Sequence, residues 1–259
     1  MQATYEAWTS LGTERIPGPH CYAIRSDRSP LIYDANLIAG VTAETPAELA
    51  EVLAFADEVH GDRAHRQVLA GGDTAPAVLA GLLQAGFEIE EGVHMLLEGP
   101  LQGPPPEEHD IREVATEADW RSAARLTRLW HEEENARPGA THQLSEEVSR
   151  QMAAALRAKS PDYRTFLLRV DGVDAAYFGA FPGVDGLGMV EDLYTVQSYR
   201  KRGLARALIH HCVADARARG AEAVLIGADA DDTPKLFYER LGFVPTSMIM
   251  SWIRRKAAD

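Results

Sequence analysis

A stretch rich in glycine and proline near the middle of the 259-residue chain restricts how the chain can fold. It reads Gly-Pro-Leu-Gln-Gly-Pro-Pro-Pro over residues 99–106. Proline has no backbone N–H to offer a strand ladder, and a proline-rich run holds the chain extended. We therefore predict a linker at residues 100–107 between two units, residues 1–99 and 108–259, each within the usual size of a domain.

The second unit alternates short apolar runs with amphipathic segments. The pattern predicts helices at residues 116–134, 145–158, 204–219 and 233–241. It predicts strands at residues 111–114, 165–170, 175–181, 188–196, 223–228 and 243–253. Such a mixture predicts an α/β (α+β) fold in which a twisted, mostly antiparallel sheet carries helices on its faces.

The first unit carries a fainter version of the end of the second. A predicted helix at residues 77–84 is followed by Gly86-Phe87 and a strand through residues 93–97. Helix, Gly-Phe and strand recur 156 residues later, at Phe243 (243 − 87). This spacing indicates an internal duplication. The alternative is two unrelated junctions, because glycine suits the left-handed end of any helix.

The formal net charge of −13 is concentrated in the first part of the chain. Residues 1–106 carry 5 Lys and Arg against 15 Asp and Glu, a net charge of −10; the remainder carries 21 against 24, a net charge of −3. Nucleic-acid affinity comes from neutralising phosphates, so no nucleic-acid partner is expected. An acidic surface keeps a protein soluble and can also attract a cationic substrate.

The remaining bulk features predict a cytoplasmic protein without a membrane segment. Every apolar stretch is shorter than the roughly 18 residues of a membrane span, and the start lacks the pattern of a secretory signal. Cys21 and Cys212 match no metal or redox spacing, so reduced thiols and no metal site are expected. The run from His131 to Glu134 reads as a solvated helix end, and the oligomeric state stays open.

A strand that runs into a basic turn and then a helix is the segment best suited to chemistry. Residues 190–206 read Val-Glu-Asp-Leu-Tyr-Thr-Val-Gln-Ser-Tyr-Arg-Lys-Arg-Gly-Leu-Ala-Arg. The free N–H groups and the dipole of a helix start attract anions, and Gly203 lets the backbone approach one closely. The positive charge comes from Arg200, Lys201, Arg202 and Arg206. A solvated turn is the alternative, but cations at a helix start oppose the dipole, and a bound polyanion would relieve that conflict.

The motif Arg200-x-x-Gly203-x-Ala205 resembles the (Gln/Arg)-x-x-Gly-x-(Gly/Ala) motif of the GNAT N-acetyltransferases. A second segment, residues 231–243, resembles the family's later signature of a helix with a tyrosine followed by Gly-Phe. The resemblance covers about residues 108–253. The first unit lacks an Arg-x-x-Gly-x-Ala turn and looks like a degenerate copy, so the resemblance implies two GNAT-like domains in tandem, with catalysis in the second.

The resemblance implies transfer of an acetyl group from acetyl-CoA, or of another acyl group from its own CoA thioester, directly to an amine. The cofactor would lie where two strands splay, with its pantetheine along residues 193–196 and its pyrophosphate on the amides of residues 202–206. The implied cofactor-binding residues are Leu193, Tyr194, Thr195, Val196, Arg200, Lys201, Arg202, Gly203, Leu204, Ala205 and Arg206. The alternative is an acyl-CoA-binding or regulatory protein without turnover.

Glu191 falls where many family members carry the carboxylate that takes the proton of the amine. An unperturbed glutamate is a weak base near neutral pH, so burial would have to raise its pKa. The alternative for Glu191 is an exposed carboxylate on the strand face. Asp192 points to the other face of the strand and is the second choice of base.

Tyr238 matches the family's general acid. A phenol is mostly protonated at neutral pH and can donate a proton to the departing thiolate. The alternative is that Phe237 and Tyr238 are core aromatics of an amphipathic helix, and the family pattern directs Phe237 to the core. The sequence does not identify the acceptor amine. Three acids on the side where the acceptor is expected, Glu132, Glu133 and Glu134, could attract an ammonium group.

Overall fold

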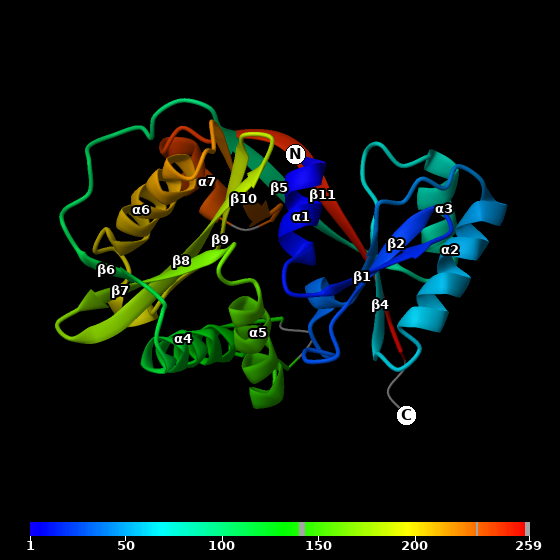
Figure 1. Cartoon of the computed structure of the whole chain (residues 1–259), viewed down its shortest axis with the longest axis horizontal. Coiled ribbons are helices and arrows are strands. Elements are labelled where there is room, and N and C mark those ends of the chain that lie inside the picture. The colour runs from blue at the N-terminus through cyan, green and yellow to red at the C-terminus, as the bar shows by residue number, and fades with distance from the viewer. Residues whose placement is uncertain (140–142, 232, 257–259) are drawn as a thin grey trace.

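The computed structural model describes residues 1–139, 143–231 and 233–256, and its strands form a single sheet. Eleven strands lie in the order β1-β2-β3-β4-β11-β5-β10-β9-β8-β7-β6, with helices on both faces (Figure 1). This arrangement confirms the predicted α/β fold. Asp232 of the second motif and the last three residues of the second expected unit lie outside the described residues.

The elements have the following bounds in chain order. The helices are α1 (Gln2–Ser10), α2 (Pro46–Val59), α3 (Pro76–Gln84), α4 (Glu117–Asn135), α5 (Glu146–Ala158), α6 (Leu204–Ala218) and α7 (Pro234–Arg240), with 3-10 turns η1 (Tyr33–Ala35) and η2 (Gln197–Tyr199). The strands are β1 (Glu14–Gly18), β2 (Cys21–Arg25), β3 (Leu37–Ala39), β4 (His65–Leu69), β5 (Glu88–Leu97), β6 (Asp110–Glu113), β7 (Arg164–Val170), β8 (Val173–Val184), β9 (Leu187–Thr195), β10 (Ala223–Asp229) and β11 (Val244–Arg255).

Helix α4 begins where the local sequence predicts. The Thr116 hydroxyl accepts a hydrogen bond from the Asp119 N–H at 3.2 Å, and the Asp119 carboxylate accepts one from the Thr116 N–H at 3.0 Å. This reciprocal pair satisfies N–H groups that have no partner inside the helix. Ser145 caps α5 in a simpler way, by accepting from the Val148 N–H at 3.2 Å.

The chain runs twice through the same order of elements. The first run is α1-β1-β2-β3-α2-β4-α3-β5, and the second is α5-β7-β8-β9-α6-β10-α7-β11. The Phe87 N–H donates to the Leu82 carbonyl at 3.1 Å, and 156 residues later the Phe243 N–H donates to the Tyr238 carbonyl at 3.1 Å. The glycine before each phenylalanine is left-handed, with φ of 78° and 98°. Because these bonds repeat at the spacing read from the sequence, the two runs are copies of one motif.

The last strands of the two runs are exchanged. Strand β11 of the second run lies between β4 and β5, while β5 of the first run lies between β11 and β10. Among the described strands every pairing is antiparallel except β3 with β4 and β9 with β10. Each run therefore contributes one parallel pair, and the exchanged strands fill the centre of the sheet between the two pairs.

The glycine- and proline-rich segment crosses the outside of the second run without regular structure (Figure 1). The Gln102 N–H donates to the carbonyl of Leu241 at 2.9 Å, and Arg206 donates to the carbonyl of Gln102 at 2.9 Å. Arg217 donates to the carbonyl of Gly99 at 2.5 Å. The segment is therefore held against α6 and the end of α7 on its way from β5 to β6.

The helices bury separate apolar cores. Residues of α6 and α7 pack on one face of β7 to β10, and residues of α1, α4 and α5 pack on the opposite face. Helices α2 and α3 form a further core with β2 to β4 and with Trp252 of β11. Within the described residues, no helix is both long and apolar enough to cross a membrane.

Candidate active site

Strands β9 and β10 diverge after a short parallel pairing, and Glu191 stands at the point of divergence. The pairing ends at Val190 and Ile226, although β9 continues to Thr195. The Glu191 carboxylate accepts a hydrogen bond from the Gly227 N–H of β10 at 2.6 Å. The side chain thus bridges the two strands where the backbone ladder stops, and it lies at the tip of a wedge.

The surroundings of Glu191 make its carboxyl group a stronger base than an ordinary glutamate. Burial, helped by the nearby charge of Asp192, raises the pKa of Glu191 to about 8, against the opposing effects of the Gly227 hydrogen bond and the Lys159 charge. The residue is half-buried, not exposed on a strand face. A carboxyl group with this pKa exchanges protons close to neutral pH.

A bulge in β9 turns Asp192 away from Glu191. Asp192 has a φ of 67°, and the register against β8 shifts between Tyr177 and Gly179. The Tyr163 hydroxyl lies 2.6 Å from the Glu191 carbonyl and 2.8 Å from the Asp192 carboxylate, so it fixes the bulge. Asp192 lines a separate small cavity of about 120 Å³ together with Trp8, Asp34 and Lys159.

Most of the predicted cofactor residues line one open cleft of about 1300 Å³. It extends from the divergence of β9 and β10 over the start of α6 to α7. The predicted residues that line it are Leu193, Tyr194, Thr195, Arg200, Lys201, Gly203, Leu204, Ala205, Arg206 and Tyr238. Val196 and Arg202 lie in the same turn but outside the lining, and Glu191 and Asp192 are also outside it.

The start of α6 differs from the starts of the other long helices. Thr45, Thr116 and Ser145 cap α2, α4 and α5 with their side chains, whereas α6 has no side-chain cap. Gly203 precedes it in a left-handed conformation, with φ of 81°, and a Cβ there would meet no atom within 4 Å. The first N–H groups of an uncapped helix remain available to an anion.

Arg200 is bound to α4, which local sequence does not predict. Its guanidinium forms an ion pair with Glu133, and it also donates to the carbonyl of Thr195 at 2.9 Å. The Tyr194 hydroxyl donates to the same Glu133 carboxylate at 2.6 Å. One wall of the cleft is therefore joined to the end of α4 by a three-residue polar network.

The structure corrects one expectation at the end of α4 and shows the partners of the three acids there. His131 is buried rather than solvated, because α4 and α5 pack together and the His131 imidazole lies 2.9 Å from the Ser149 hydroxyl. The three following carboxylates are already in ion pairs. These pairs are Glu132 with Arg128, Glu133 with Arg200, and Glu134 with Arg137.

Tyr238 lies between the core and the cleft. Only 5% of its surface is exposed, and its ring centroid lies 6.2 Å from that of Phe243 in the apolar core. Phe237, which the family pattern directs to the core, is less buried than Tyr238 and also lines the cleft. The short helix α7 places both rings at this boundary, so the assignment of Phe237 as the buried member of the pair was wrong.

The small cavity beside Asp192 adjoins the cleft at Trp130, which lines both. The Lys159 ammonium lies 3.2 Å from the centre of the Trp8 ring in this region. Burial lowers the pKa of Lys159, against the opposing charges of Asp192, Asp34 and Glu191. Residues of the first run thus line a cavity next to the strand that carries Glu191.

Comparison with known proteins identifies the family. The model of the "Acetyltransferase (GNAT) family" matches residues 110–243, which is just over half of the chain. The chain therefore belongs to the GNAT family of acetyltransferases. No curated protein matches the sequence. Among the described residues, no group of three or more His, Cys, Asp or Glu side chains is placed to hold a metal ion.

Solved structures share the fold over nearly the whole chain. A GCN5-related N-acetyltransferase from Kribbella flavida has a TM-score of 0.68 at 17% identity, covering 99% of this chain and 97% of its own. A functionally unknown protein from Staphylococcus epidermidis has a TM-score of 0.68 at 13% identity, covering 95% and 96%. A tandem GNAT protein from the clavulanic acid biosynthesis pathway has a TM-score of 0.56 at 15% identity, covering 93% and 80%. These similarities confirm the predicted tandem arrangement of the fold.

Proposed function

We propose that the protein transfers an acetyl group from acetyl-CoA, or another acyl group from the corresponding acyl-CoA, to an amine. The observation that carries this proposal is the cleft, which is lined by the uncapped, basic start of α6, by Tyr238 and by Leu193, two residues beyond Glu191 on β9. The cofactor's diphosphate suits the N–H groups of residues 202–206, and its pantetheine suits the free backbone edge of β9 at residues 193–196.

The two proton transfers of the reaction are assigned to Glu191 and Tyr238. Acetyl-CoA supplies the activated thioester when it is bound. Glu191 takes the first proton that the ammonium group must lose, and the amine nitrogen then forms a bond to the acyl carbon while the carbon–sulfur bond breaks. The acylated nitrogen releases its second proton to solvent, which leaves a neutral amide. Tyr238 gives its hydroxyl proton to the departing sulfur and regains one from solvent. Asp192 is the second choice of base because it lies beside Glu191 but lines a different cavity.

We assign catalysis to residues 108–259, with residues 100–107 as linker and residues 1–99 as a copy without cofactor. Two features of the first run support this assignment, one contact and one residue position. The Glu48 carboxylate accepts from the N–H groups of Glu44 and Thr45 at the start of α2, which corresponds to α6. Leu82 stands 156 residues before Tyr238, in the place of the proposed general acid.

Acetyl-CoA should stabilise the protein against heat, and Gly203→Val should weaken that effect. At a ligand concentration 100 times the Kd the stabilisation is about 2.7 kcal/mol. Valine would place methyl groups in the open space before α6 and would strain a left-handed backbone, so we expect affinity to fall by about tenfold or more. Thermal shift and calorimetric titration measure both effects.

Gly220→Val is the matched control, because Gly220 also has a positive φ and an open Cβ direction but follows the far end of α6. It should lose comparable stability and keep its affinity for acetyl-CoA. The cofactor assignment fails if saturating acetyl-CoA changes neither the melting temperature nor the calorimetric heat of the unaltered protein.

One acetyl-CoA should bind per chain. The first run has no basic turn, and its own carboxylate occupies the start of α2. Calorimetry at a known protein concentration should give a stoichiometry near one, and Gly203→Val should reduce the heat of that single event. A stoichiometry near two would contradict the assignment of the first run as a copy without cofactor.

A further inference from the structure

The small cavity beside Asp192 is built by both runs of the chain. The first run contributes the end of α1, residues 26–29 after β2, and η1. The second run contributes α4, α5, Tyr177 of β8 and Asp192 of β9. Three of its wall residues, Trp8, Leu156 and Tyr177, are buried. The cavity therefore lies where the two copies of the motif meet, and neither copy forms it alone.

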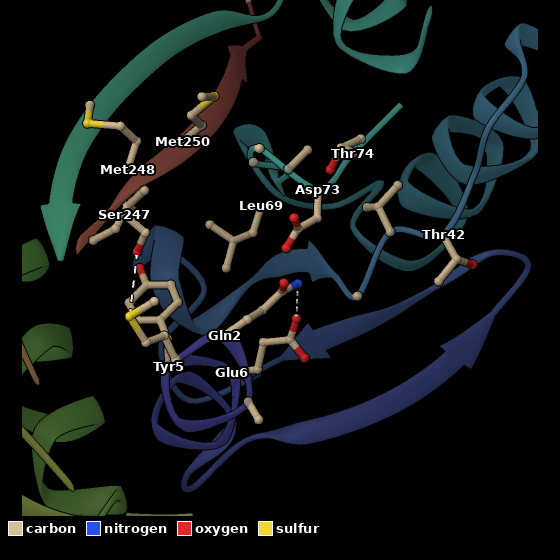
Figure 2. Close-up of a pocket in the computed structure, with 18 of the residues that line it drawn as sticks. Gln2, Tyr5, Glu6, Thr42, Leu69, Asp73, Thr74, Ser247, Met248 and Met250 are labelled. Atoms are coloured by element: carbon tan, nitrogen blue, oxygen red, sulfur yellow. Dashed lines mark hydrogen bonds between the residues drawn. The ribbon is translucent and has the colours of Figure 1, made fainter. Parts of the chain in front are cut away.

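Different turns of α1 line this cavity and a larger one of the first run. The larger cavity has a volume of about 1350 Å³, and Tyr5, Glu6 and Asp73 are among the residues that line it (Figure 2). Trp8 and Thr9, one turn further along α1, line the small cavity instead. Among the described residues none lines both cavities, so a substitution in the larger cavity leaves the lining of the small one intact.

Lys159, directly after α5, brings an ammonium group without a hydrogen-bond partner to the small cavity. Its Nζ lies 3.2 Å from the centre of the Trp8 ring and 5.9 Å from that of Tyr163, but no acceptor in the described part of the chain bonds to it. The side chain is partly exposed and Nζ is not among the enclosed polar atoms, so its donors are open to the cavity. An ammonium group has three donors, and an aromatic face satisfies none of them with an oxygen. This group therefore suits an anionic group of a ligand.

Two carboxylates face the same cavity without reaching Lys159. Asp34 of η1 accepts a hydrogen bond from the Gln67 amide at 3.2 Å, and Asp192 accepts one from the Tyr163 hydroxyl at 2.8 Å. Both charges act on the Lys159 ammonium, yet neither carboxylate forms an ion pair with it among the described residues. The space between them therefore suits a ligand that carries a positive and a negative group of its own.

The cavity adjoins the place where the acyl group would be transferred. Trp130 lines both this cavity and the cofactor cleft. Asp192 follows Glu191 in β9, and the charge of Glu191 also acts on the Lys159 ammonium. The rest of the lining includes apolar side chains, which suit an apolar body: Leu11, Ile32, Met152 and Leu156.

We propose that this cavity binds the acceptor and that the acceptor is an α-amino acid with an apolar side chain. The inference rests on the proposed function, since it identifies the amine that would be acylated. The ammonium group of the ligand would pair with Asp34 and Asp192, and its carboxylate would pair with Lys159. Arg28 also lines the cavity and has no ion-pair partner among the described residues, so a second cation is available.

The size of the cavity favours an α-amino acid over a longer zwitterion. Its volume is about 120 Å³, so the two charged groups of a ligand must lie close together and leave room for the apolar body. In an α-amino acid both groups are attached to one carbon atom. The first run would then take part in acceptor recognition, through Asp34, Arg28 and Trp8, although it binds no cofactor.

The test is calorimetric titration of the full chain with L-valine, L-leucine and L-phenylalanine, with and without saturating CoA. Each amino acid is compared with the amine that lacks its carboxylate (isobutylamine, isopentylamine and phenethylamine) and with the acid that lacks its amine (isovalerate, isocaproate and hydrocinnamate). We expect at least one amino acid to bind about tenfold or more tightly than its matched amine and its matched acid, because only the amino acid complements both charges of the cavity.

Lys159→Met should weaken binding of that amino acid by about tenfold or more and leave binding of its matched amine unchanged. Methionine keeps an apolar side chain beside Trp8, and because burial lowers the pKa of Lys159, loss of the charge should not lower the melting temperature. Lys256→Met is the matched control, because Lys256 is exposed after β11, where it donates to the Gly61 carbonyl. It should leave both affinities unchanged.

Asp34→Asn tests the other end of the ligand. It should weaken binding of the amino acid and of the matched amine alike, because both carry the ammonium group. Asp73→Asn removes a carboxylate from the larger cavity of the first run and should change neither affinity (Figure 2).

The proposal is overturned if none of the three amino acids binds, if none binds more tightly than its matched amine, or if Lys159→Met binds the amino acid with undiminished affinity. Acetyl-CoA is titrated into the same proteins, and its affinity should be unchanged in all four variants. Failure of the unaltered protein to bind acetyl-CoA would overturn the proposed function instead, so the two failures are distinguishable.

Discussion

Replacing Glu191 with glutamine should lower kcat for amine acylation by about 10²–10⁴-fold, the usual contribution of a general base. Glutamine keeps an oxygen that can accept the Gly227 hydrogen bond at the divergence of β9 and β10, but it cannot take a proton. The affinity for acetyl-CoA should stay nearly unchanged because the basic turn is untouched. Steady-state kinetics on an acceptor found by screening amines, with calorimetry for the cofactor, measure both quantities.

The pH dependence of the same reaction gives a second measure of this role. Since the pKa of Glu191 is raised to about 8, the basic carboxylate is the minor form at neutral pH. The rate should therefore rise with pH through about 8 and level off above it, and the Glu191→Gln variant should lack this rise. An unaltered protein whose kcat/KM is flat across that range would remove Glu191 as the base.

The raised pKa of Glu191 also has a consequence for stability with a defined sign. Its ordinary value is 4.5 and its folded value about 8, so the folded state holds the proton more tightly than the unfolded state. The contribution to stability is fully present below about pH 4.5 and is lost as pH rises through about 8. Above that range Glu191→Gln should unfold at a temperature no lower than that of the unaltered protein.

Replacing Tyr238 with phenylalanine should lower kcat by about tenfold to 10⁴-fold, with the smaller value applying if water partly replaces the lost acid. The substitution keeps the ring that packs near Phe243 and removes only the hydroxyl. One hydrogen bond contributes about 1 kcal/mol net, so the melting temperature should change little. The affinity for acetyl-CoA should be nearly kept.

Leucine at position 238 is the complementary variant, because the first run carries Leu82 at the corresponding position. Tyr238→Leu should lose turnover as Tyr238→Phe does and should also lose stability through poorer packing. If Tyr238 has only a structural role, the two variants should behave differently. Tyr238→Phe should then keep the kcat of the unaltered protein, and Tyr238→Leu should lose activity only because less of the protein is folded. Full kcat in the Phe variant, with chemistry rate-limiting, would leave Tyr238 with packing alone.

The local sequence predicts those parts of the fold that are determined by interactions between residues close together in the chain. The capping box of Thr116 and Asp119 starts α4 where it was expected. The glycine that ends α7 lies in the left-handed conformation its place requires. The basic turn and Tyr238 line one cleft as expected. Each of these features depends on residues within a few positions of one another.

Features that depend on contacts between residues far apart in the chain could not be predicted from the local sequence. Strands β5 and β11 occupy equivalent positions in the two copies, 156 residues apart in the sequence, and they pair with each other. The local sequence of a strand does not specify which other strand it pairs with. The pairing of Arg200 with Glu133 needs α4 to pack beside the basic turn. The acidic residues that follow His131 led to the expectation that its side chain is solvated, but the packing of α4 against α5 buries it.

The exchange of the final strands ties the order of synthesis to the order of folding. Strand β11 is made after every other strand, yet it lies between β4 and β5, which are made long before it. A chain that ends before β11 lacks the strand that separates β4 from β5, so the first run cannot reach the strand pairing of the complete chain until the last residues have been made.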